Sequence, residues 1–138
     1  MLKRSPCGRW TTIELGPLPI EAIKYYLGIS LAPGQVVFHW HAQKHAFEEE
    51  DKRYREKICS PHYVSTICDP THVGQQPKYI GKAFDIVRVV SDVGPIVLLG
   101  IGITPQKKGI YGVHSAYLLE SDTLERRIRV KTTHKIMI

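Results

Sequence analysis

The chain has 138 residues, and 43% of them are hydrophobic, which suffices for the core of one domain and excludes a wholly disordered protein. Nineteen Lys and Arg residues against thirteen Asp and Glu residues give a formal net charge of +6, which favours an anionic partner such as nucleic acid. Three cysteines without a CxxC pair argue against a secreted disulfide framework, and no apolar run is long enough to span a membrane, so we expect a cytoplasmic protein without a membrane partner.

The N-terminal half is predicted to be mostly helical. Residues 1–18 are rich in Pro and Gly and are expected to form an arm or loop. A short strand is expected at 36–38. Capping residues, Pro positions and apolar spacing predict three helices. They should span residues 19–28, 41–58 and 60–67.

The C-terminal half changes to strand patterns. Alternating or continuously apolar segments predict four strands, at 84–90, 96–103, 110–117 and 126–133. Helices followed by strands on short turns indicate an α+β fold, with N-terminal helices packed on a four-stranded antiparallel β-meander. We divide this single globular domain into an N-terminal arm and helix at 1–35 and an α+β domain at 36–138.

The segment from His39 to His45 carries three histidines and a lysine within seven residues, a high density of groups that exchange protons near neutral pH. On a helix, His41, Lys44 and His45 share one face. Two imidazoles can serve as base and acid when an RNA 2′-hydroxyl attacks its own phosphodiester, and a lysine can stabilise the charge that develops. These three residues are therefore candidate catalytic groups.

The same histidines also have metal-ligand spacings. Four further Cys or His side chains follow them, at Cys59, His62, Cys68 and His72. An HExxH motif is absent, because position 42 is Ala, and no acidic residue lies close in sequence. We therefore favour proton transfer, expect neither a metal nor another cofactor, and keep a His/Cys metal-binding protein as an alternative.

Basic side chains on the predicted strands are candidates for phosphate binding. Three of them alternate along the last strand, at Arg127, Arg129 and Lys131. Arg88 shares a face with apolar neighbours, so we expect it to be partly buried with an anionic or acceptor partner. Ser115 and Tyr117 share another strand face and are candidates to line a nucleotide cleft.

With these segments in order, the chain resembles the barnase–EndoU–colicin–RelE-like nuclease superfamily, most closely its phage-associated and toxin-like branches. Three parts carry the resemblance: the helix motif His41-Ala42-Gln43-Lys44-His45, the helix end Ile67-Cys68-Asp69-Pro70, and the four strand segments, of which the third contains His114-Ser115-Ala116-Tyr117. It covers about residues 36–134.

The resemblance implies metal-independent RNA cleavage, usually to a 2′,3′-cyclic phosphate, by toxins of toxin–antitoxin or interbacterial systems. It implies RNA as the substrate and a protein antitoxin or immunity protein as a partner. Carried onto this sequence, it makes His41 and His45 acid and base, gives Lys44 an electrostatic role, and has Ser115 and Tyr117 orient the phosphate or the base. A non-catalytic RNA-binding or phage-associated domain is the alternative.

Overall fold

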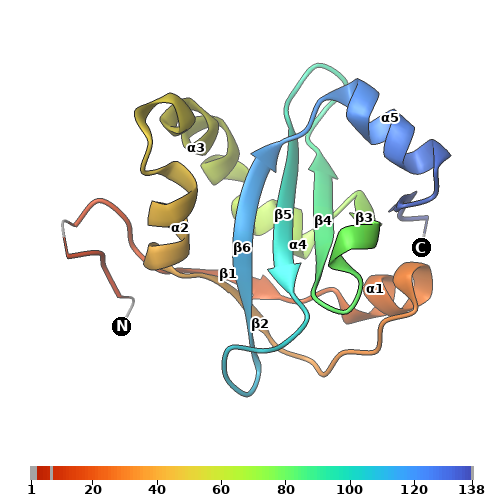
Figure 1. Ribbon diagram of the computed structural model, residues 1–138, viewed down its shortest axis with the longest axis horizontal. Helices are drawn as coiled ribbons and strands as arrows, with labels where there is room; N and C mark the ends of the chain where they lie inside the picture. Colours follow the sequence, from red (N-terminus) through yellow and green to blue (C-terminus); the bar gives the residue numbers. More distant parts are fainter. Residues whose placement is uncertain (1–2, 7, 138) are drawn as a thin grey trace.

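The computed structural model describes residues 3–6 and 8–137 (Figure 1). Within them the chain forms an α+β fold around a seven-stranded sheet of order β1-β2-β6-β5-β4-β3-β7. The strands are β1 Ile13–Pro17, β2 Gln35–Phe38, β3 His72–Gly74, β4 Ala83–Val89, β5 Ile96–Gly102, β6 Ile110–Leu118 and β7 Thr133–Lys135. Neighbouring strands are antiparallel except β2 and β6, which are parallel.

Helices lie on one face of this sheet and around its rim. They are α1 Ile20–Leu27, α2 Trp40–Phe47, α3 Arg53–Cys59, α4 Tyr63–Cys68 and α5 Ser121–Arg129, with the short 3₁₀ turns η1 Glu50–Lys52, η2 Ser60–His62 and η3 Pro77–Tyr79. Figure 1 shows α4 behind the central strands, α2 and α3 beside β6, and α5 at the opposite side. Helix α1 begins after Pro19 and ends at Gly28, whose φ of 70° lies in the left-handed region, as the sequence predicts.

The expected four-stranded antiparallel meander is wrong. The sheet has seven strands in the described residues, and the β2–β6 pair makes it mixed. The strands expected at 84–90, 96–103 and 110–117 are present as β4, β5 and β6, but β1, β3 and β7 lie in segments where the sequence predicts loops or other elements. These three strands have at most five residues each, too few to show a clear hydrophobic period.

The strand expected at 126–133 is instead the end of helix α5 and the turn after it. Its alternating charges suit a strand, but Leu124 and Ile128 are also one helical turn apart, and Leu124 is buried against the fold. Basic residues in the last turn suit the negative end of a helix. The expected row of Arg127, Arg129 and Lys131 on one strand face therefore does not exist.

The helix expected at 41–58 is divided in two. Helix α2 ends at Phe47, Glu49 is extended, and α3 begins only at Arg53. Four consecutive acidic residues, Glu48 to Asp51, occupy the break. In a continuous helix Glu48 and Asp51 would be neighbours at i,i+3, and like charges at this spacing disfavour the helix.

The two faces of the central strands differ in composition. Ile86, Leu99 and Ala116 pair across β4, β5 and β6 and are almost completely buried, in one cluster with residues of α4. We call this side the covered face. One position earlier on β4, the row Asp85, Gly100 and Ser115 lies on the other side, which we call the open face.

Candidate functional site

A β-bulge on β6 changes which of its side chains reach the open face. Gly100 pairs with Ser115, but the next residue of β5, Ile101, pairs with Val113, so His114 is an extra residue on β6. Val113 is buried, whereas His114 and Ser115 both line the open face. Sequence alternation places Ser115 and His114 on opposite faces, and the bulge removes that separation.

The bulged His114 faces the histidines of α2. A hollow of about 440 Å³ is lined by His39, His41, Ala42, His45, Gln106 and His114. We call it the histidine hollow. Four imidazoles from two segments about 70 residues apart in sequence therefore meet at one place, because β2 runs parallel to β6 and α2 follows β2 directly.

Helix α2 is held firmly at its first turn. The buried Gln43 donates from Nε2 to the carbonyl oxygens of Thr11 and Phe38, at 2.7 and 2.9 Å. The backbone N–H of Trp40 donates to Oγ1 of Thr12 at 3.1 Å. The Trp40 N–H is one of the groups that a helix start otherwise leaves unpaired, and the Gln43 bonds tie α2 to Phe38 of β2 and to Thr11, so the orientation of the histidine-bearing face is fixed by these segments.

The α2 histidines have different environments. His39 caps the helix, because its Nδ1 accepts the backbone N–H of His41 at 3.1 Å. Burial lowers the pKa of His39, and the charges of Lys3 and His41 lower it further, which favours the neutral ring that capping requires. His41 and His45 are exposed, and both line the hollow. Their imidazoles are therefore accessible to a ligand in the hollow.

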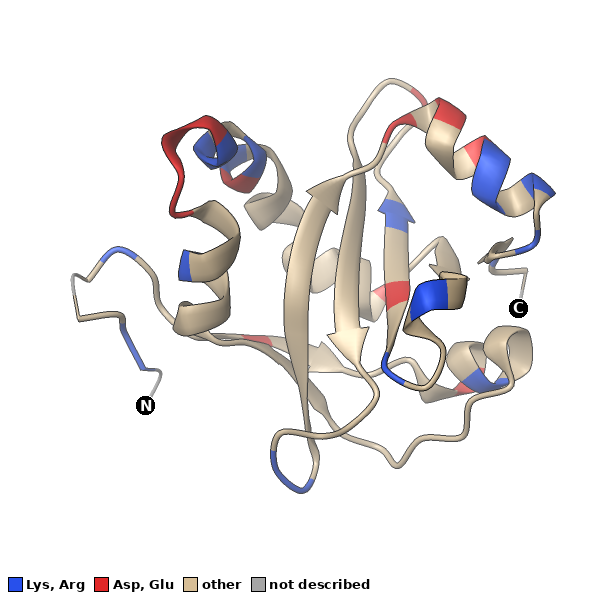
Figure 2. Ribbon diagram, in the orientation of Figure 1, with Lys and Arg blue, Asp and Glu red and all other residues tan. Residues whose placement is uncertain are grey.

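A second and larger hollow adjoins the first, with His114 lining both. Its volume is about 520 Å³, within the range of roughly 300–1,000 Å³ that is typical of small-ligand sites. We call it the Asp85 cleft. Its lining includes the open-face residues Asp85, Gly100 and Ser115. It also includes Tyr117 of β6, Lys78 and Tyr79 of η3, and Arg127 of α5. Figure 2 shows basic segments on η3 and α5 and an acidic segment in β4.

Asp85 is the acidic group of this cleft. It is 8% exposed, and Arg127 Nη1 lies 3.9 Å from its Oδ2, too far for a hydrogen bond. Burial raises the pKa of Asp85 to about 6, against the opposing charge of Arg127. Nε of Arg127 is buried and has no hydrogen-bond partner among the described residues. Both groups therefore keep hydrogen-bonding capacity that a ligand could use.

Two glycines of β5 make room for the polar side chains of the open face. A Cβ at Gly100 would overlap Oγ of Ser115, and a Cβ at Gly102 would overlap Nε2 of His114. Both side chains thus lie directly against β5. The absence of side chains at 100 and 102 sets the positions of Ser115 and His114 as much as their own strand does.

The structure brings together only part of the predicted site. His41 and His45 line the histidine hollow, and Ser115 and Tyr117 line the Asp85 cleft. Lys44 lines neither, and its Nζ lies 4.0 Å from Oε1 of Glu48 on the same helix. The hollow that Ser115 and Tyr117 line therefore meets the hollow of His41 and His45 at His114. His114 was not among the predicted site residues.

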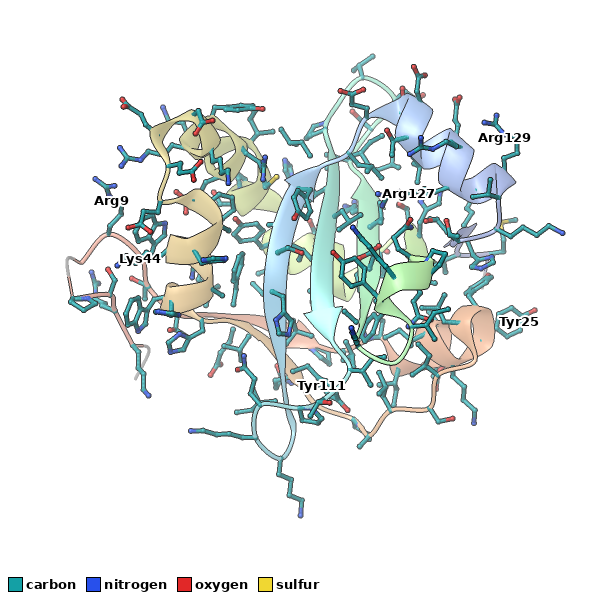
Figure 3. The ribbon with its side chains drawn as sticks, viewed as in Figure 1. Arg9, Tyr25, Lys44, Tyr111, Arg127 and Arg129 are labelled. Carbon is teal, nitrogen blue, oxygen red and sulfur yellow. The ribbon has the colours of Figure 1, made fainter. Side chains whose placement is uncertain are left out.

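The basic residues are dispersed. Arg88 is partly buried, as expected, and its Nη1 lies 3.0 Å from Oδ2 of Asp69, away from both hollows. Figure 3 shows Arg127 on the side of α5 nearer the sheet and Arg129 on the side away from it. Lys131 follows the helix end with a φ of 64° and is exposed. Of these four, Arg127 alone lines the Asp85 cleft.

Sequence reasoning missed Asp85, His114, Lys78 and Tyr79. A signal for Asp85 was available, because it is an isolated acid inside an apolar strand, and such a residue needs a polar partner or a functional reason. Nothing in the sequence marks the bulge at His114. Lys78 and Tyr79 lie on η3, in a segment predicted as an irregular connection.

Residues 3–6 and 8–137 contain no group of three or more His, Cys, Asp or Glu side chains arranged to hold a metal ion. No helix in this part of the chain is both long and apolar enough to cross a membrane. Comparisons with protein-family models, with curated proteins and with solved structures found no match to this chain.

Proposed function

We propose that this protein is a small ribonuclease that cleaves RNA without a metal, by attack of a 2′-hydroxyl on the adjacent phosphodiester. The observation that carries the proposal is the histidine hollow, where imidazoles from α2 and β6 face each other. A phosphate held there has two imidazoles of α2 on one wall, which can remove and supply protons, and the imidazole of His114 on the other wall. The net charge of +6 supports an anionic substrate.

In this proposal His41 and His45 act as base and acid. One imidazole takes the 2′-hydroxyl proton, and the oxygen attacks phosphorus. The bond from phosphorus to the 5′-oxygen breaks, and that oxygen takes a proton from the second, protonated imidazole. His114 contacts the phosphate from the opposite wall. The products are a 2′,3′-cyclic phosphate and a free 5′-hydroxyl.

The Asp85 cleft extends the substrate path. Ser115 can donate a hydrogen bond to a phosphate or base, and Tyr117 offers a half-exposed ring for stacking. The guanidinium of Arg55 lies 5.2 Å from the centre of that ring and adds positive charge beside it. We assign no catalytic role to Lys44. A toxin role and a protein antitoxin or immunity partner are further proposals that rest on the family resemblance.

Incubation of the purified protein with total cellular RNA in EDTA, followed by end-group analysis of the fragments, tests the proposal. We expect fragments that end in 2′,3′-cyclic phosphate. Intact RNA together with salt-sensitive RNA binding would overturn it in favour of a non-catalytic RNA-binding domain. Cleavage that EDTA abolishes would overturn the metal-independent mechanism.

Substitution of the α2 histidines tests the assigned residues. We expect His41→Ala and His45→Ala each to slow cleavage by roughly 10²- to 10⁴-fold, because each removes one proton transfer. Both side chains are exposed, so thermal unfolding should change little. The control is Asp51→Asn, an exposed residue of η1 outside both hollows. If both histidine variants fold and cleave at the control's rate, the assignment is wrong.

A further inference from the structure

Resting on the proposed ribonuclease function, we propose that the Asp85 cleft is a nucleobase subsite that selects guanine. Three features of the cleft support this proposal. They are an acceptor pair on its floor, aromatic rings on its walls, and cations that suit a phosphate. Each feature comes from different side chains of the cleft.

The floor offers two acceptor oxygens to a ligand. Asp85 lines the cleft, its Oδ2 is 3.9 Å from Nη1 of Arg127, beyond hydrogen-bond distance, and Gly100 beside it has no side chain to cover it. Burial raises its pKa to about 6, so the carboxylate is ionised at neutral pH. Guanine presents two neighbouring donors, N1–H and the N2 amino group, which match the two oxygens of a carboxylate.

Other bases match this floor less well. Adenine and cytosine each place a ring-nitrogen acceptor beside their amino group, and uracil places its one N–H between two carbonyl oxygens. Each would direct an acceptor toward the carboxylate. Guanine also carries O6 next to N1, and Arg127, whose Nη1 lies 3.9 Å from Oδ2 of Asp85, provides a donor for it. The carboxylate of Asp85 and the guanidinium of Arg127 thus match the neighbouring N1–H donor and O6 acceptor of guanine.

The walls suit a flat ring. Tyr79 and Tyr117 both line the cleft and are 41% and 47% exposed, so their rings remain available for stacking. They come from η3 and β6, two elements that border the open face. Large exposed aromatic side chains that converge on one cleft indicate a planar ligand more than an aliphatic one.

The charge of the cleft excludes the main competitor. A carboxylate between tyrosines also suits an arginine side chain of a peptide. Lys78 and Arg127 line the same cleft, however, and would repel a guanidinium. A guanine nucleotide satisfies both signs, because its base supplies donors for Asp85 and its phosphate can pair with Lys78.

Calorimetric titration with guanosine, inosine and adenosine 5′-monophosphates tests this inference without measuring cleavage. We expect guanosine monophosphate to bind about tenfold or more tightly than adenosine monophosphate, with inosine monophosphate between them because it lacks the N2 amino group. Equal binding of all three, or tighter binding of N-acetylarginine amide, would overturn the guanine subsite.

Variants locate the preference. Asp85→Asn should abolish the preference for guanosine monophosphate, because an amide presents one acceptor and one donor in place of two acceptors. The matched control, Asp92→Asn in the exposed turn between β4 and β5, should leave it intact. A guanine preference that persists in Asp85→Asn would refute the role of Asp85.

Removal of a wall ring should act on every base. We expect Tyr79→Ala to weaken binding of all three nucleotides by about tenfold. Tyr25→Ala, an exposed tyrosine of α1 far from the cleft, is the control and should have no effect (Figure 3). If Tyr79→Ala binds like this control, the stacking wall is wrong.

The two proposals can fail separately. Binding of guanosine monophosphate and cleavage of RNA are measured in separate experiments. Guanine-selective binding without any RNA cleavage would refute the ribonuclease and leave the subsite standing. Cleavage without base preference in binding would refute the subsite alone.

Discussion

The covered and open faces of the central strands are built from alternating residues of the same three strands, yet they differ in almost every property. Ile86, Leu99 and Ala116 are apolar, buried and packed in the main core. Asp85, Gly100 and Ser115, their direct neighbours in sequence, line a polar cleft. Two residues that are neighbours in sequence can therefore have different roles, because the face of the sheet on which a side chain lies decides whether it packs in the core or lines the cleft.

The difference shows how this small fold separates stability from chemistry. The covered face is completed by α4, so its residues are fixed by packing. The middle of the open face is bordered by η3 and α5 but keeps a hollow of about 520 Å³. Substitutions on the two faces should consequently change different measured quantities, and four predictions test this comparison.

Leu99→Ala and Ser115→Ala should separate the faces most clearly. Loss of the fully buried Leu99 side chain should lower the free energy of unfolding by about 2–5 kcal/mol, through lost burial and a cavity. Ser115→Ala should change it by less than about 0.5 kcal/mol, while RNA cleavage slows about three- to tenfold through the lost hydrogen bond. Denaturant unfolding measures the stability of both variants, and RNA cleavage measures their activity. A larger stability loss in Ser115→Ala than in Leu99→Ala would contradict the comparison.

The buried carboxylate of Asp85 should lower the free energy of unfolding when it is ionised. Its pKa is about 6 in the folded protein and near 3.8 when unfolded, so the folded state holds the proton more tightly. The free energy of unfolding should therefore fall as pH rises from about 4 to above 6, by about 3 kcal/mol relative to Asp85→Asn.

Denaturant unfolding of both proteins from pH 3 to pH 8 measures this difference. Arg127, Lys78 and His114 also line the cleft, and they are present in both proteins, so the comparison isolates the effect of Asp85. Parallel pH profiles for the two proteins would show that Asp85 is not destabilised by burial.

Gly102→Ala should show that a residue without a side chain positions His114. The new methyl group must displace the imidazole, and a misplacement of about 1 Å can slow catalysis about 100-fold. The double variant with His114→Ala should cleave no more slowly than His114→Ala alone, because both changes act on one group. Rate losses that multiply would show that Gly102 acts in another way.

His39 should give the smallest effect, because it contributes one capping hydrogen bond at the start of α2. We expect His39→Ala to lower the free energy of unfolding by about 1 kcal/mol, and His39→Asn to restore it, since asparagine also caps well. Thermal unfolding measures both. A His39→Asn variant that remains as unstable as His39→Ala would rule out capping as the main role of this ring.

Elements with a long, clear pattern could be predicted from the sequence. Helix α1 and strands β4, β5 and β6 have enough residues and sharp enough ends for their type to be read correctly. Helix α5 is mistaken for a strand because a segment that alternates charged and apolar residues also carries Leu124 and Ile128 at helical spacing. Tertiary packing decides between the two readings, and the sequence alone does not contain it.

The candidate site was predictable only where its members are close in sequence. His41 and His45 share a helix face, and their four-residue spacing alone is enough to group them. His114 joins them through the β2–β6 pairing and a bulge, and Asp85 joins Arg127 through the packing of α5. Such contacts depend on register and on element placement, which local patterns do not determine.

The parallel pairing of β2 with β6 also sets the order in which the site is assembled. Gln35 pairs with Ile110, so a loop of about 75 residues must close before the wall that carries His114 meets α2. Contacts of such long range form slowly, and a chain that emerges from its N-terminus carries the α2 histidines long before β6 exists. For a protein whose proposed activity destroys RNA, this order keeps the wall that carries His114 away from the α2 histidines until β6 has been made.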